Sequence, residues 1–287
     1  MRIAIGTAQF GMDYGIANTA GRVPQPEVQK ILDLARKNGV DTIDTAALYG
    51  HSEAVLGAVG VSDFKIVTKV PPLPADIKAP VEWLHSVIHS SLHSLRVNYL
   101  DIVLFHRASD IIGNAGEALL DAISAAQKLG RIGKVGLSIY SPQELDQVVT
   151  KFLPECVQAP INVFDRRMIS SGWLGHLRRE GVEVHARSLF LQGLLLMEAS
   201  ERPEYFNRWR KDFEAYDDWV QGSGLHPVQA NTAYLSKIEE IERVVVGVDS
   251  AEQLREVVAG VSSGVRLPPP PKLTQDEALL DPSRWVH

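Results

Sequence analysis

The chain has 287 residues, of which 45% are hydrophobic, and a formal net charge of −6 at neutral pH. That length and composition can form a large core, in one α/β barrel or in two smaller domains. No apolar run approaches the roughly 18 residues of a membrane span, and we find no signal-peptide pattern. The negative charge and the absence of basic blocks argue against a nucleic acid or an anionic membrane as partner.

The only cysteine is Cys156. A single cysteine excludes an internal disulfide and fits a reducing compartment, so we expect a cytoplasmic protein. Cys156 lies beside a predicted strand, where a cysteine is more often a core residue than a nucleophile.

Eight segments have the short, apolar or β-branched pattern of strands, and helical patterns separate them. The strands are predicted at residues 3–7, 40–44, 64–70, 99–105, 134–138, 157–163, 182–186 and 243–247. The main helices are predicted at residues 26–39, 52–60, 81–95, 119–130, 142–149, 174–179, 228–241 and 251–259. Eight such βαβ units predict a parallel sheet closed into a (β/α)8 TIM barrel, in one domain over residues 1–287. A doubly wound open sheet is the alternative, but no Gly-x-Gly-x-x-Gly follows the first strand.

Two segments interrupt the alternation of strands and helices. Residues 198–226 form a long loop after the seventh strand, and residues 265–287 form a proline-rich C-terminal tail that includes Trp285. Aromatic side chains are concentrated in the loop: Tyr205, Phe206, Trp209, Phe213, Tyr216 and Trp219. Because their spacing is partly helical, we expect a helix packed on the barrel rather than a row of substrate contacts.

Three histidines recur at four-residue spacing on the helix predicted at residues 81–95. His85, His89 and His93 could bind a metal, since side chains on successive turns share one side of a helix. No carboxylate or thiolate is interleaved with them, however, and they flank the apolar face. We therefore predict a solvated helix surface there, and no metal site.

Polar side chains with useful chemistry occur where neighbouring strands end. Asp44, Lys69 and His106 end the second, third and fourth predicted strands, and Tyr49 is on the loop after the second. In a barrel, catalytic groups lie at the C-terminal ends of the strands. A carboxylate, an ammonium and an imidazole are therefore expected at one barrel mouth, beside a phenol.

With these four residues assembled, the chain resembles the aldo-keto reductase family over nearly its whole length, apart from the long loop and the tail. The matching segments are Asp-Thr-Ala-Ala-Leu-Tyr-Gly-His-Ser-Glu at 44–53, Thr-Lys-Val at 68–70, Ser-Leu-His-Ser-Leu-Arg-Val-Asn-Tyr-Leu-Asp-Ile-Val-Leu-Phe-His at 91–106, Gly-Arg-Ile-Gly-Lys-Val-Gly-Leu-Ser at 130–138, Gln-Ala-Pro-Ile-Asn-Val-Phe-Asp-Arg-Arg at 158–167 and Gly-Val-Asp-Ser-Ala-Glu-Gln-Leu at 247–254.

The resemblance implies hydride transfer between a nicotinamide cofactor, usually NADPH, and the carbonyl group of a small aldehyde or ketone. Tyr49 would donate the proton, with Lys69 and Asp44 behind it and His106 beside it. The chemistry of the residues supports these roles. A free phenol is a weak acid near neutral pH, an adjacent ammonium favours its ionised form, and a carboxylate keeps that ammonium charged. An imidazole can donate a hydrogen bond to the substrate oxygen.

The resemblance also implies cofactor-binding positions along the strand ends. Ser138 and Gln158 match the residues that bind the nicotinamide amide, and Ser188 with Leu189 matches the pyrophosphate loop after the seventh strand. The remaining matches are Thr7 at the end of the first predicted strand and Gly247, Ser250 and Gln253 at the start of the last helix, where a helix N-terminus favours a phosphate.

Three residues depart from the family pattern and concern the cofactor. Ile139 stands where the family usually has an asparagine that bonds to the carboxamide. Arg187 stands near the position of an aromatic residue that often stacks on the nicotinamide, and its charge would favour the reduced cofactor over the oxidised one. Asp249 stands where a basic or neutral residue commonly meets the 2′-phosphate of NADPH, so NADH is a possible cofactor.

Three classes of function are consistent with the sequence. A working carbonyl reductase has the complete set of acid–base residues. A cofactor-binding regulatory protein could retain the fold without turnover, and a barrel enzyme acting on sugars, such as a lyase or an epimerase, could use similar side chains. The sequence identifies neither the substrate nor the oligomeric state.

Overall fold

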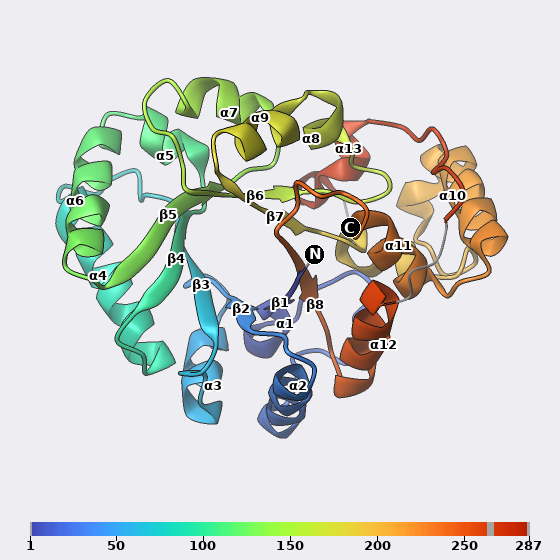
Figure 1. Cartoon of the computed structure of the whole chain (residues 1–287), viewed down its shortest axis with the longest axis horizontal. Helices are drawn as coiled ribbons and strands as arrows, with labels where there is room; N and C mark the ends of the chain where they lie inside the picture. Colours follow the sequence, from blue (N-terminus) through green and yellow to red (C-terminus); the bar gives the residue numbers. More distant parts are fainter. Residues whose placement is uncertain (1, 263–266, 286–287) are drawn as a thin grey trace.

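The computed structural model describes residues 2–262 and 267–285, in which eight parallel strands close into a barrel in chain order (Figure 1). The strands are β1 (Arg2–Gly6), β2 (Thr42–Asp44), β3 (Lys65–Val70), β4 (Leu100–Phe105), β5 (Ile132–Ser138), β6 (Cys156–Pro160), β7 (Glu183–Arg187) and β8 (Arg243–Gly247). β1 pairs with β2 on one side and with β8 on the other, which closes the ring. The predicted (β/α)8 fold is therefore confirmed.

Helices surround the barrel, and short helical turns occupy several loops (Figure 1). The α-helices are α1 (Ala8–Gly11), α2 (Gln25–Lys37), α3 (Ser52–Val59), α4 (Pro80–Leu95), α5 (Ala108–Ile112), α6 (Gly116–Lys128), α7 (Gln143–Val148), α8 (Arg167–Ser170), α9 (Trp173–Arg179), α10 (Arg210–Ser223), α11 (Pro227–Leu235), α12 (Ala251–Ser262) and α13 (Glu277–Leu280). The 3₁₀ helices are η1 (Leu191–Leu196), η2 (Glu204–Trp209) and η3 (Pro282–Arg284).

Several predicted boundaries differ from the structure, and local hydrogen bonds explain two of them. β6 ends at Pro160 instead of residue 163, because the side chain of Asn162 accepts hydrogen bonds from the backbone N–H groups of Phe164 and Asp165 and turns the chain. α11 ends at Leu235 instead of residue 241. Tight four-residue turns follow it, in which Ile238 N–H donates to the Leu235 carbonyl, and they lead directly into β8.

The long segment after β7 builds a second apolar cluster with the C-terminal tail. η2 and α10 lie beside the ring of barrel helices (Figure 1). The buried members of the cluster include Phe206, Trp209, Phe213, Tyr216, Trp219, Leu273, Leu279, Leu280 and Trp285. The expected helix packed on the barrel is therefore confirmed. Residues 265, 266, 286 and 287 of the predicted tail lie outside the described residues.

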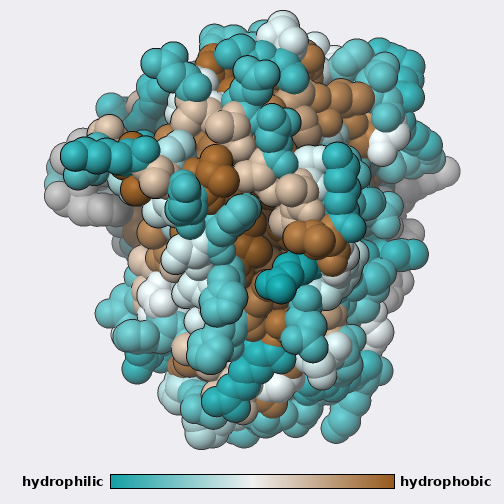
Figure 2. Space-filling model, turned by 90° about the vertical axis from the view of Figure 1, so that its left-hand side faces the viewer, coloured by the Kyte–Doolittle hydropathy of each residue, from teal (hydrophilic) through white to brown (hydrophobic). Residues whose placement is uncertain are grey.

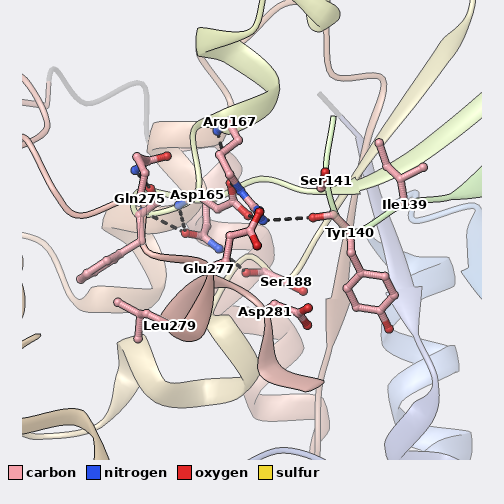
Figure 3. Close-up of polar contacts among 12 residues, drawn as sticks. Ile139, Tyr140, Ser141, Asp165, Arg167, Ser188, Gln275, Glu277, Leu279 and Asp281 are labelled. Carbon is pink, nitrogen blue, oxygen red and sulfur yellow. Dashed lines mark hydrogen bonds and ion pairs between the residues drawn. The ribbon is translucent and has the colours of Figure 1, made fainter. Parts of the chain in front are cut away.

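Polar contacts fix the tail to the loop that follows β6 (Figure 3). The Gln275 side chain donates to the Phe164 carbonyl over 2.7 Å. The Arg167 guanidinium pairs with the buried Asp165 carboxylate at 2.7 Å and with Glu277 of α13 at 3.5 Å. The tail is thus held against the C-terminal side of the barrel, close to the loops that carry candidate site residues.

The outer surface that carries α4 and α6 is mostly polar, with apolar residues between the polar ones (Figure 2). His85, His89 and His93 are exposed on α4, as predicted for a solvated helix surface. Within residues 2–262 and 267–285, no helix is long and apolar enough to cross a membrane.

The buried phenol of Tyr216 gives a test of how the second cluster is anchored. Its hydroxyl donates to the Leu195 carbonyl at 2.8 Å and accepts from the Asn231 amide at 2.6 Å. Tyr216→Phe leaves both groups without this partner and should lower the free energy of unfolding by about 1–3 kcal/mol in chemical denaturation. Tyr234→Phe, in the same cluster, is the control and should cost less. Equal losses would contradict this account of the anchor.

Candidate active site

A cavity of about 440 Å³ opens at the C-terminal ends of the strands. It brings together all four predicted catalytic residues, Asp44, Tyr49, Lys69 and His106. It also includes seven of the predicted cofactor residues: Thr7, Ser138, Gln158, Ser188, Leu189, Gly247 and Gln253. Ser250 is not among the described residues that line it.

Close backbone packing positions the loop that carries Tyr49. A Cβ atom on Gly11 would lie 1.8 Å from the Tyr49 carbonyl oxygen, so only glycine permits this contact between α1 and the loop. Gly50 follows with a φ of 55°, which favours glycine, and its own Cβ would lie 2.4 Å from the Gly11 carbonyl oxygen. Ser52 N–H then donates to the Tyr49 carbonyl where α3 begins. The phenol is therefore presented from a fixed turn.

A buried ion pair lies beneath Tyr49. The Lys69 ammonium is 2.5 Å from the Asp44 carboxylate, and the two side chains are only 1% and 3% exposed. The ammonium also donates to the Thr45 carbonyl, and the Gln158 amide donates to the second Asp44 oxygen at 2.6 Å. Both charges are thus paired and hydrogen-bonded, which is the condition for keeping an ion pair in a low-dielectric site.

This pair places a cation against the Tyr49 ring. Lys69 Nζ lies 5.2 Å from the ring centroid. Burial alone would lower the pKa of Lys69, but the Asp44 carboxylate outweighs it, so the pKa is raised and the side chain remains an ammonium. A permanent positive charge therefore faces the phenol.

His106 stands on the other side of the phenol at the end of β4. Its ring meets the Tyr49 ring edge-on, with centroids 6.4 Å apart and an interplanar angle of 79°. Burial, together with the positive charges of Lys69 and Arg187, lowers the pKa of His106 to about 4. The buried Nδ1 atom has no hydrogen-bond partner within the described residues. The imidazole is therefore neutral at physiological pH, and it has unused hydrogen-bonding capacity.

The predicted nicotinamide-side residues lie close to this group. Ser138 ends β5 and pairs in register with Gln158 in the middle of β6, and both side chains are almost fully buried. The Thr7 hydroxyl donates to the Asp44 carbonyl at 3.1 Å and accepts from Ser52. Thr7 therefore ties β1 to the β2 end in addition to lining the cavity.

At the C-terminal end of β8, two side chains that were predicted to bind the cofactor form hydrogen bonds at the start of α12. The Ser250 hydroxyl accepts from the Gln253 N–H at 3.2 Å, and the Gln253 side chain accepts from the Asp249 N–H at 2.7 Å. This arrangement starts α12 in the manner of a capping box. Asp249 lines the cavity with one buried carboxylate oxygen that has no partner within the described residues, and burial raises its pKa.

Several lining residues were missed by sequence reasoning. Tyr14 and Asn18 come from the loop after β1, Tyr140 from the loop after β5, and Gln192 from the start of η1. The first and last of these segments meet, since Ile16 N–H donates to the Gln192 carbonyl at 3.1 Å. The glycine-rich character of the first loop was a usable signal. No sequence pattern marked Gln192, which has an unusual positive φ of 55°.

The three departures from the family pattern have different environments. Ile139 is fully buried in the core and does not line the cavity. Arg187 does line it, and its guanidinium lies 4.5 Å from the centroid of the Tyr140 ring. Asp249 is near the start of α12, as expected. Of these three residues, Arg187 and Asp249 therefore line the cavity and Ile139 does not.

The lowered pKa of His106 predicts a pH dependence of stability. In the folded protein His106 stays neutral down to pH about 4, whereas the unfolded chain takes up the proton below the ordinary value of 6.5. Its contribution to the free energy of unfolding should therefore fall as pH drops between these values, by up to roughly 3 kcal/mol. Denaturation of wild type and His106→Asn across this range measures the difference. Parallel stability curves would count against a buried neutral imidazole.

Known proteins that are similar to this chain include oxidoreductases. The family model for the aldo/keto reductase family matches residues 2–264. An oxidoreductase of Leptosphaeria maculans, sirO, is 25% identical over 91% of this chain and 89% of its own. The L-glyceraldehyde 3-phosphate reductase of Escherichia coli O157:H7 is 26% identical over 88% of this chain and 84% of its own.

Among solved structures, the fold is similar to that of an aldo-keto reductase from Bacillus halodurans in its holo form. The TM-score is 0.74 at 19% sequence identity, with 91% of this chain and 86% of the other covered. The family model, moreover, matches nearly the whole chain. The chain belongs to the aldo/keto reductase family, whose members are oxidoreductases that reduce carbonyl groups.

Proposed function

We propose that the protein reduces an aldehyde or ketone to an alcohol with NADPH or NADH, and that Tyr49 donates the proton. The observation that carries the proposal is the convergence of Asp44, Tyr49, Lys69 and His106 in one cavity, although they come from two strands and two loops. Membership of a family of carbonyl-reducing oxidoreductases supports the same reaction class.

The roles of the four residues follow from their contacts. A bound reduced nicotinamide would supply the hydride to the carbonyl carbon. As negative charge develops on the substrate oxygen, Tyr49 gives it the phenolic proton and becomes a phenolate beside the Lys69 ammonium. Asp44 keeps that ammonium charged in its buried position. The neutral His106 can donate a hydrogen bond to the same oxygen, which orients the carbonyl.

A second phenol in the cavity is a poorer candidate for the proton donor. Burial and the neighbouring Tyr49 raise the pKa of Tyr14, which makes Tyr14 a weaker acid than a free phenol. Among the described residues, its hydroxyl has a single side-chain hydrogen bond, which it accepts from the Gln192 amide at 3.5 Å. Lys69, by contrast, faces the Tyr49 ring directly. The electrostatic environment therefore favours Tyr49.

The cavity residues fit a nicotinamide dinucleotide at both ends. Ser138 and Gln158 offer polar groups for a carboxamide beside the catalytic cluster. Ser188 and Leu189 would offer backbone N–H groups to a pyrophosphate. A Cβ on Gly247 would lie 2.4 Å from the end of the Gln9 side chain, so glycine leaves room for Gln9 beside the C-terminal end of β8. The partnerless oxygen of Asp249 could accept a hydrogen bond from an adenosine ribose hydroxyl.

Replacement of the proton donor tests the assignment of Tyr49. Tyr49→Phe should lower carbonyl reduction on the order of 10²- to 10⁴-fold, while cofactor affinity changes little, because only the acid is lost. Tyr14→Phe, which removes a hydroxyl from the same cavity, should cost less than about tenfold. Steady-state kinetics of both variants give the comparison. A Tyr49→Phe enzyme with unaltered turnover would refute the assignment.

The acidic side chains near the C-terminal end of β8 lead us to expect weak discrimination between NADPH and NADH. Asp249 and Glu256 line this end, and no described lysine or arginine of the β8–α12 region lines the cavity beside them. A carboxylate about 6 Å from a 2′-phosphate dianion is repelled by roughly 1.4 kcal/mol in water, and a helix N-terminus offsets about 0.3–1 kcal/mol. We expect a preference for NADPH below about tenfold.

Titration of each cofactor against intrinsic tryptophan fluorescence measures this preference without turnover. Asp249→Asn should shift the ratio of affinities toward NADPH, since it removes the repulsive charge. Its effect on NADH should be small. A preference for NADPH above about a hundredfold in the wild type would mean that a cation from another loop binds the 2′-phosphate.

A further inference from the structure

Arg187 is a cation that lines the cavity, and no charged partner for it is found in the described part of the chain. It ends β7, and its guanidinium donates to the Ser188 hydroxyl at 3.2 Å and to the Ile139 carbonyl at 3.0 Å. Both acceptors are neutral. Within residues 2–262 and 267–285, no carboxylate oxygen forms an ion pair with it at 4.0 Å or less. The remaining N–H groups of the guanidinium are available to a ligand.

Three other arginines with largely buried side chains each form an ion pair with an aspartate. Arg167 pairs with Asp165, Arg202 pairs with Asp217, and Arg243 pairs with Asp41. Burial of a charge is costly unless it is paired. The half-buried Arg187 therefore differs from these three arginines, because it has no ion pair within the described residues.

The charge of Arg187 acts on the catalytic end of the cavity. It contributes to the lowered pKa of His106, and it opposes the raised pKa of Lys69. Asp44 already neutralises Lys69. The guanidinium contacts the loop after β5, whereas the acidic side chain of Asp249 belongs to the β8 end. One uncompensated positive charge is therefore left beside the reacting groups.

The Tyr140 ring gives this guanidinium a fixed platform. Arg187 lies 4.5 Å from the ring centroid. The backbone around the ring is held on both sides, since Tyr140 N–H donates to the Glu144 carboxylate at 2.7 Å and its carbonyl accepts from Arg167 at 3.0 Å. Figure 3 shows the Arg167 contact, with the Tyr140 ring pointing away from it. A preorganised guanidinium loses little freedom when it binds an anion.

We propose that Arg187, supported by Tyr140, binds an anionic group on the substrate, so that the preferred substrates are aldehydes or ketones carrying a carboxylate or a phosphate. This inference rests on the proposed carbonyl reduction and names its substrate class. Arg187 pairs with the anion through its planar fork of N–H donors while the carbonyl lies against Tyr49. The anion thereby supplies the missing counter-charge.

Matched pairs of substrates separate the charge from all other properties. For the carboxylate, 4-carboxybenzaldehyde is compared with 4-nitrobenzaldehyde, which has nearly the same shape and no charge. For the phosphate, 4-formylphenyl phosphate is compared with 4-methoxybenzaldehyde. Wild type, Arg187→Met and Arg187→Lys are assayed with NADPH. Arg107→Met is the control, because Arg107 is an exposed arginine at the end of β4 that does not line the cavity.

The expected result is a loss that depends on substrate charge. Arg187→Met should lower kcat/KM for at least one anionic aldehyde on the order of 10- to 100-fold more than for its neutral counterpart. Arg187→Lys should restore part of the loss, and Arg107→Met should affect both members of a pair alike. The carboxylate and phosphate pairs show which anion fits.

Three outcomes would overturn the inference. Equal losses for charged and neutral aldehydes mean that Arg187 does not bind the substrate anion. Loss of cofactor affinity with an unchanged substrate ratio would assign Arg187 to the nicotinamide or the pyrophosphate. Calorimetric binding of 4-carboxybenzaldehyde that is equally tight in wild type and Arg187→Met would refute it without any turnover. Failure to reduce even 4-nitrobenzaldehyde would instead count against the proposed function.

Discussion

The ion pair between Lys69 and Asp44 is the interaction on which the rest of the site depends. A fully buried ammonium and carboxylate are costly to desolvate, and each is tolerated only because the other stands 2.5 Å away with further hydrogen bonds around the pair. Removal of either partner would leave an uncompensated charge at the barrel mouth. The pair also joins β2 to β3, so the same contact supports the fold and places a cation under the Tyr49 ring.

The positive charge of Lys69 affects a neighbouring group that lines the cavity. His106 is held neutral because burial and two nearby positive charges disfavour its protonation. Arg187 adds a charge that no described carboxylate balances, and the adjacent Tyr140 loop is in turn held by Arg167, which also meets the C-terminal tail. A chain of contacts therefore runs from the tail to the cavity wall, and the second apolar cluster stabilises it.

Much of this arrangement could be predicted from the sequence, because apolar runs show where the strands end. Asp44, Lys69 and His106 each follow an apolar run, and the barrel rule brings such ends together. Contacts set by irregular backbone could not be predicted. Ser250 and Gln253 cap α12 instead of both facing the cavity, and the β6 strand ends early because of a side-chain turn at Asn162. The orientation of Arg187 toward Tyr140 depends on two loops that no periodicity describes.

The central claim is that this cavity transfers a hydride from a nicotinamide to a carbonyl carbon while Tyr49 supplies the proton. Isotope tracing tests both parts in one measurement. The protein is incubated with 4-nitrobenzaldehyde and NADPH that carries deuterium in place of both C4 hydrogens, and the alcohol is analysed by mass spectrometry and NMR. The account predicts one deuterium on the carbinol carbon in the wild type and a strongly reduced yield of labelled alcohol in Tyr49→Phe. Alcohol without deuterium on that carbon, or a label that enters it only from deuterated solvent, would contradict the account.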